Sequence, residues 1–146
     1  MTDQKLSEEI KGILSSAFEY GEDQFKIVES NPKQYEIVNA LPILYAKKMV
    51  ATCVERENCG CHKVGDRYVF NATGFLIKDE TCDMPCLWAM SSFYPLSLML
   101  LERTASGLPP NGLHQEYVAC PDTGCKCGGV GKALFKITIE NAPTTT

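Results

Sequence analysis

Apolar residues in the first part of the chain recur three and four positions apart, which is the pattern of an amphipathic helix. Over residues 3–29 this pattern predicts one long helix, weakened around Gly21. The apolar positions that define it are Leu6, Ile10, Ile13, Leu14, Ala17, Phe18, Phe25 and Val28.

A second, shorter helix is predicted over residues 33–41. It is preceded by Asn31 and Pro32, which are suited to an N-cap and to the first turn of a helix. The two helices make up a cysteine-free segment, residues 1–41, that we treat as a helical N-terminal arm. Such an arm is a candidate for contacts between two copies of the chain.

Beyond residue 42 the pattern changes to one typical of strands. The clearest case is the last, where apolar residues alternate with lysine, threonine and glutamate. The turn sequence Asn-Ala-Thr-Gly between the second and third segments indicates a hairpin. Strands are predicted over residues 43–55, 67–70, 75–78, 115–119 and 132–140.

One long helix is predicted over residues 84–104, beginning after Asp83 and kinked at Pro95. It is apolar on nearly all sides, including Trp88 and Tyr94, and such a helix is usually buried centrally. Residues 42–146 therefore form a cysteine-rich domain of the α+β class. We expect an antiparallel sheet or a small open barrel around one central helix.

Composition excludes some partners. The net charge is −4 and no basic run stands out, so we expect no nucleic-acid partner. The most apolar segment, residues 87–101, is shorter than the about 20 residues that span a bilayer, so we expect no membrane segment. The first residues lack the apolar core of a secretion signal, which predicts a cytoplasmic protein.

The chain has eight cysteines, a high count for a cytoplasmic protein. In a reducing compartment clustered cysteines usually bind metal or perform redox chemistry, whereas secretion would favour disulfides. Here they form three groups, the outer two of which resemble each other in spacing. The groups are Cys53, Cys59 and Cys61 with His62 adjacent; Cys82 and Cys86; and Cys120, Cys125 and Cys127.

Thiolates are soft donors that suit zinc or an iron–sulfur cluster, and tight glycine-bearing turns allow them to converge. The candidate metal ligands are Cys59, Cys61, His62, Cys82, Cys86, Cys120, Cys125 and Cys127. Two four-cysteine sites are one interpretation; a single site drawing on all three groups is the other and is slightly favoured. Buried cysteines without a ligand role are the third, although six of the eight fall in two predicted loop regions or at their edges.

Three short motifs resemble a family of small uncharacterised proteins of archaea and anaerobic bacteria. They are His62-Lys-Val-Gly-Asp66, Cys86-Leu-Trp-Ala89 followed by Tyr94-Pro95, and Cys120-Pro-Asp122. The resemblance covers roughly residues 48–140. It implies no activity, but it points to Cys59 or Cys61, His62, Cys86 and Cys120 as a shared polar set. In this chain Pro85 precedes Cys86, where family members place a proline after the cysteine.

The function expected is that of a cytoplasmic metal-binding protein with a [4Fe–4S]-type iron–sulfur cluster. It would transfer electrons to a redox partner or serve as an accessory subunit of an anaerobic enzyme, and the link to anaerobes favours iron–sulfur over zinc. A structural zinc domain that binds a protein partner is one alternative. Another is an enzyme that uses an open-site cluster or a reactive thiolate, with a nucleophile in residues 120–127 and His62 as base. No catalytic residue is assigned.

Overall fold

The structure is a computed structural model that describes residues 4–143. By its internal contacts the chain divides between Leu44 and Tyr45 into two compact units. Each unit has a hydrophobic core of its own. Within the described residues, no helix combines the length and the apolar character needed to cross a membrane.

The N-terminal unit is built of short helices. These are α1 (Glu8–Phe18), α2 (Glu22–Ser30), α3 (Pro32–Asn39) and α4 (Leu41–Tyr45), the last ending at the unit boundary. The single helix predicted over residues 3–29 is wrong: it is two helices, and its predicted first residue lies outside the described ones. The break occurs because Glu19 adopts a left-handed φ of 57° and Gly21 then caps α2, donating its N–H to the Gln24 side chain at 3.0 Å.

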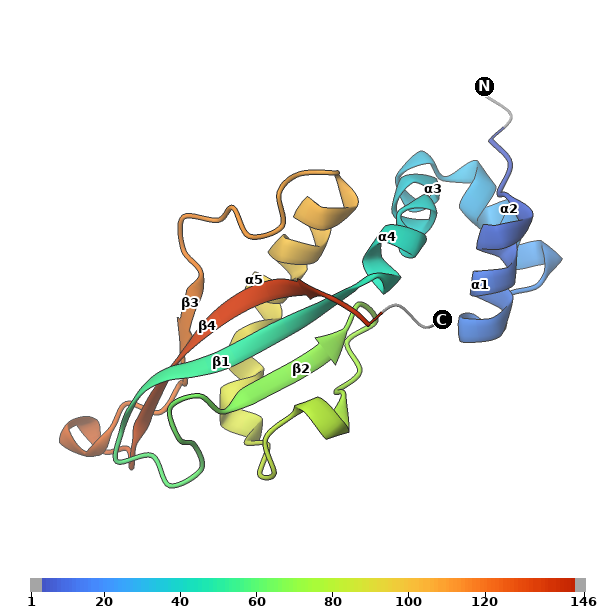
Figure 1. Ribbon diagram of the computed structural model, residues 1–146. Coiled ribbons are helices and arrows are strands. Elements are labelled where there is room, and N and C mark those ends of the chain that lie inside the picture. Colours follow the sequence, from blue (N-terminus) through green and yellow to red (C-terminus); the bar gives the residue numbers. More distant parts are fainter. Residues whose placement is uncertain (1–3, 144–146) are drawn as a thin grey trace. The chain divides into compact units, whose positions relative to one another are not determined.

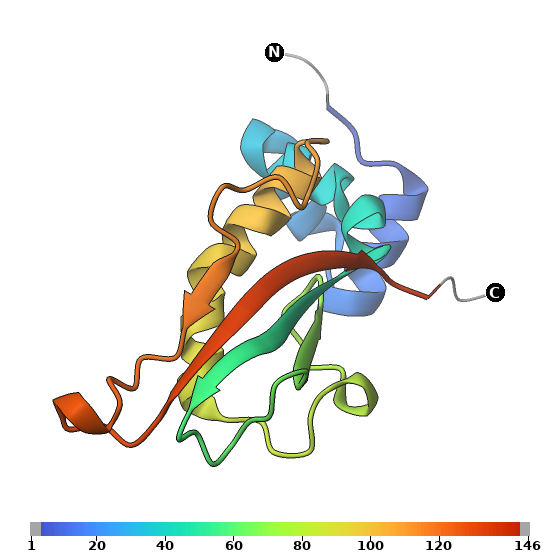
Figure 2. The same cartoon turned by 60° about the vertical axis from the view of Figure 1, so that its left-hand side comes forward.

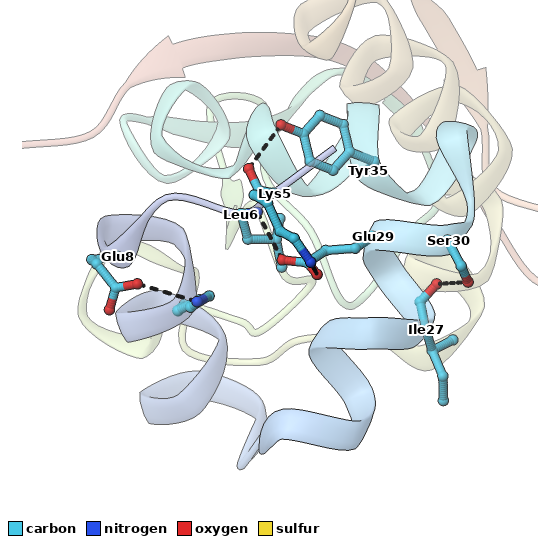
Figure 3. A network of polar contacts seen from close by, with 8 residues as sticks. Lys5, Leu6, Glu8, Ile27, Glu29, Ser30 and Tyr35 are labelled. Atoms are coloured by element: carbon cyan, nitrogen blue, oxygen red, sulfur yellow. Dashed lines mark hydrogen bonds and ion pairs between the residues drawn. The ribbon is translucent and has the colours of Figure 1, made fainter. Parts of the chain in front are cut away.

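Glu29 fastens the start of the described chain to α2 (Figure 3). Its carboxylate accepts hydrogen bonds from the Leu6 N–H at 3.0 Å and from the Lys5 ammonium at 3.2 Å. The Tyr35 hydroxyl donates to the Lys5 carbonyl at 3.1 Å and adds α3 to the same network. The helices enclose a small core of their own, made of Leu6, Ile10, Leu14, Phe25, Val28 and Val38.

The strand predicted over residues 43–55 begins later than expected. Residues 41–45 form α4, with Pro42 in its first turn, where the missing N–H of proline costs no hydrogen bond. β1 then runs over Lys47–Glu57.

The C-terminal unit has an α+β fold with an open antiparallel sheet. Its other strands are β2 (Arg67–Asn71), β3 (Tyr117–Ala119) and β4 (Lys132–Asn141). The strand order is β2-β1-β4-β3, with Val50 opposite both Val69 and Thr138. The strand predicted over residues 75–78 is wrong, because this segment makes only an isolated bridge from Leu76 to Phe70 before a short 3₁₀ turn, Lys78–Glu80.

Helix α5 (Leu87–Ala105) lies across one face of this sheet (Figures 1 and 2). Its inner side meets inward-pointing residues of the strands, which follow the period of two. The resulting core contains Met49, Ala51, Cys53, Tyr68, Ala89, Phe93, Leu96, Leu100, Ala133, Phe135, Ile137 and Ile139.

The expected central burial of this helix is wrong, because the sheet covers only one of its sides. Trp88 is 69% exposed and Tyr94 is 66% exposed, so neither belongs to the core. The helix also continues through Pro95 to Ala105.

Candidate functional site

The loop after β1, the loop after β3, the segment that precedes α5 and the first turn of α5 all lie at one end of the C-terminal unit (Figure 1). Because the sheet is antiparallel, the end of β1 lies beside the start of β4, and the end of β3 lies there too. Cys59 follows β1, and Cys120 follows β3, donating its N–H to the Ala133 carbonyl at 2.8 Å. Cys86 is the N-cap residue of α5 at this same end.

Four thiols gather at this end, where Cys59 and Cys86 each affect the protonation of both Cys61 and Cys120. Lost hydration raises the pKa of the Cys61 thiol, and hydrogen bonding and charge repulsion from Cys86 and Cys59 raise it further. Burial also raises the pKa of the Cys120 thiol; a backbone N–H at Asp122 opposes this, and Cys86 and Cys59 add to it. We call Cys59, Cys61, Cys86 and Cys120 the thiol quartet.

Asp122 shapes the loop that carries Cys120. Its carboxylate accepts hydrogen bonds from the N–H groups of Gly124 at 2.8 Å, Val130 at 3.0 Å and Gly131 at 3.3 Å. These bonds lower the pKa of the Asp122 carboxyl group and close the loop into a compact form. The loop therefore presents Cys120 in a defined position.

A buried histidine and a buried tyrosine lie behind the quartet. His62 Nδ1 is 3.2 Å from the Cys59 sulfur, and His62 Nε2 is 2.5 Å from the Tyr68 hydroxyl. The same hydroxyl accepts the N–H of Cys86 at 2.8 Å. Burial lowers the pKa of His62 and raises the pKa of Tyr68, so both side chains are neutral near pH 7.

The other cysteines lie apart from the quartet or at its margin. Cys82 hydrogen-bonds to Tyr68, and burial raises the pKa of its thiol. Cys53 is buried within β1, where its thiol donates to the Glu55 carbonyl at 3.6 Å. Cys125 and Cys127 are exposed in a short 3₁₀ turn. Neither is among the described side chains that shift the pKa of Cys61 or Cys120.

A partly open cavity of about 300 Å³ adjoins Cys61 and His62. Its walls combine positive and negative side chains with a further thiol, and they include Arg56, Lys63, Asp66, Cys82 and Asp83. The Arg56 guanidinium also donates to the Cys59 carbonyl at 2.6 Å, which fixes the near wall. A small molecule therefore has a path to the Cys61 side of the quartet.

The described part of the chain, residues 4–143, contains no group of three or more His, Cys, Asp or Glu side chains placed to hold a metal ion. The quartet is a set of neighbouring thiols rather than a closed ion site. Protein-family models, curated proteins and solved structures give no match to this chain. The resemblance to proteins of anaerobes stays a prediction, and the function must be argued from geometry.

Two residues of the site were not singled out from the sequence. Tyr68 reads there as an ordinary strand residue, and its only signal is that it shares the inward face of β2 with Phe70. Arg56 lies in a charged run at the end of β1 and has no signal of its own.

Proposed function

We propose that this chain is a cytoplasmic metal-binding protein whose centre is held by the thiol quartet. The observation that carries the proposal is that the ends of β1 and β3 and the N-cap of α5 bring thiols from three separate segments of sequence to one end of the sheet. Thiolates in this number suit an iron–sulfur cluster or zinc. We assign a [4Fe–4S]-type cluster first, on the sequence-based prediction that three short motifs resemble proteins of anaerobes.

The position of Cys86 supports a negatively charged centre. It is the N-cap residue of α5 and makes no side-chain cap bond, so no side chain of its own satisfies the free N–H groups of the first helical turn. These N–H groups and the helix dipole favour negative charge. Four metal-bound thiolates would supply such charge at this point.

The residues fit the cofactor in donor type and number, while their side chains would have to reorient. In the metal-free chain the Cys61 thiol interacts with Cys86 and Cys59 directly. Loading would turn these side chains from one another toward a common body and remove their protons. When bound, an iron–sulfur cluster would supply one-electron transfer, which suits exchange with a redox partner or an accessory role in an anaerobic enzyme.

The test is to purify the protein without oxygen, record its visible spectrum and count iron, sulfide and zinc per chain. About four iron and four sulfide atoms per chain in a brown protein are expected for one cluster. One zinc in a colourless protein would replace this assignment with a structural zinc domain. No metal, even after anaerobic reconstitution with iron, sulfide or zinc, would overturn the metal centre altogether.

A thiol-based enzyme is the second candidate, because a thiol and an imidazole lie 3.2 Å apart beside a cavity. The structure pairs His62 with Cys59, not with the loop of residues 120–127 from which a nucleophile was expected. The thiols of Cys61 and Cys120 have raised pKa values, which disfavours a reactive thiolate. One thiol that alkylates far faster than the others would support this candidate; uniformly slow alkylation would count against it.

The four thiols of the quartet all belong to the C-terminal unit, residues 45–146. The proposed role of the N-terminal unit is in pairing two copies of the chain, which sedimentation of the chain with and without residues 1–41 would test. Loss of a dimer on truncation would support the role, and an unchanged number of chains per particle would contradict it.

A further inference from the structure

We propose that Tyr68 is a positioning residue for this centre. Its hydroxyl orients His62 so that the Nδ1–H group donates to the Cys59 sulfur, and it holds the backbone of Cys86 at the same time. This inference rests on the proposed metal centre and gives Tyr68 and His62 a role in positioning its ligands.

Both side chains are fixed by burial. His62 is 2% exposed and Tyr68 is fully buried. The Tyr68 ring packs edge-on against Phe93 and Phe135, with ring centroids 5.2 and 5.9 Å apart, and the His62 ring meets Phe135 at 5.1 Å. Packing of this kind prevents either ring from turning away, so their polar atoms depend on the partners found here.

Counting donors and acceptors sets the direction of the hydrogen bonds. The Tyr68 oxygen accepts the Cys86 N–H, and its own hydrogen has two possible acceptors, the sulfur of Cys82 and Nε2 of His62. A thiol sulfur is a weak acceptor, so the hydrogen goes to His62 when Nε2 is bare. A neutral imidazole has one N–H and one bare nitrogen. A metal-bound Cys59 sulfur has no proton and can only accept, so Nδ1 must carry the hydrogen. The bare Nε2 then accepts from the Tyr68 hydroxyl.

Tyr68 therefore serves two ligand residues from different segments. Through His62 it provides a hydrogen bond to the sulfur of Cys59, and directly it fixes the N-cap of α5 at Cys86. Hydrogen bonds to a ligand sulfur hold the ligand in place and raise the reduction potential of an iron–sulfur cluster. Without the hydroxyl, His62 would lose the hydrogen bond that orients it toward Cys59, and the N–H of Cys86 would lose its acceptor.

Three variants of the full chain separate this role from packing. Tyr68→Phe keeps the ring and removes the hydroxyl. His62→Leu removes both ring nitrogens, whereas His62→Asn keeps an N–H donor at the position of Nδ1. We expect Tyr68→Phe and His62→Leu to lose metal to a chelator about 10- to 100-fold faster and to have a lower reduction potential. His62→Asn should lie closer to the wild type in both.

The outcomes distinguish this inference from the proposed function. A wild-type chain that takes up no metal overturns the metal centre itself. A wild type that loads normally, with Tyr68→Phe equal to it in chelator resistance and potential, overturns the role of Tyr68 alone.

A direct measurement covers the case in which Tyr68→Phe does not fold. Nitrogen NMR of histidine-labelled, zinc-loaded wild-type protein reports which ring nitrogen of His62 carries the hydrogen. Protonated Nδ1 is expected, and a bare Nδ1 with protonated Nε2 would contradict the inference.

Discussion

Gly131 packs directly on the backbone of Asn58. A β-carbon at Gly131 would lie 2.5 Å from the Asn58 carbonyl oxygen and 2.8 Å from the amide nitrogen of Cys59. This contact joins the loop after β1 to the segment that enters β4. Cys59 directly follows Asn58, and the loop that begins at Cys120 ends at Gly131, so the contact joins the two loops that carry these cysteines.

A methyl group at Gly131 should force these segments apart, because the atoms it meets are backbone and cannot rotate away. We expect Gly131→Ala to lower the free energy of unfolding by about 1–3 kcal/mol, as overpacking does. Urea unfolding of the metal-free protein measures this. Gly60→Ala is the matched control, since a β-carbon there meets no atom within 4 Å. Equal losses in the two variants would contradict the explanation.

Metal content should divide the cysteines into two classes. Serine in place of Cys86 or Cys120 should reduce bound metal well below the wild-type amount, because each removes a quartet ligand. The double variant Cys125→Ser, Cys127→Ser should keep it, because both thiols are exposed in a separate 3₁₀ turn and are not part of the quartet. Metal analysis of anaerobically reconstituted proteins decides this. Loss of metal from the double variant would instead favour a site that includes the outer loop.

Stability of the metal-free protein should depend on pH through His62. Burial lowers the pKa of His62 below its ordinary value of 6.5, so the unfolded chain binds the proton first as pH falls. The stabilisation is fully present above pH 6.5 and is lost as pH falls toward the folded-state pKa. Urea unfolding between about pH 5 and 8 should show this slope. His62→Gln should flatten it, and an unchanged slope in that variant would exclude His62 as its source.

The two sides of α5 should respond differently to truncation. Phe93 is 2% exposed and packs between Tyr68, Phe70 and Phe135, so Phe93→Ala should cost about 3–5 kcal/mol of stability. Trp88 lies on the exposed side, so Trp88→Ala should lower the stability by less than about 1 kcal/mol. Thermal or urea unfolding measures both. A large loss at Trp88 would mean that something covers this side in solution.

Local pattern was sufficient for some elements of the fold. β4 was predicted over 132–140 and is found at Lys132–Asn141, because its two faces differ in polarity at every step. The extent of α5 was predicted within a few residues. The sides of α5 that are buried could not be predicted, because apolar character shows which residues tolerate burial and not what covers them.

The site shows the same division. Spacing and glycine content indicated that the cysteines lie in loops. The selection of Cys59, Cys61, Cys86 and Cys120 depends on the pairing of β1 with β4 and on where α5 begins, which are long-range relationships. Such pairings leave no periodic trace in the sequence. Tyr68 could not be recognised for the same reason, since its partners come from other segments.

The strand order has a consequence for how the proposed centre would be assembled during synthesis. β4 is the last strand described, yet it lies between β1 and β3 and brings their ends together. Cys59, Cys61 and Cys86 leave the ribosome well before the strand that gathers them with Cys120. They must remain reduced and unpaired through that interval. The proposed centre would therefore need the finished sheet, and no fragment that ends before β4 should be able to form it.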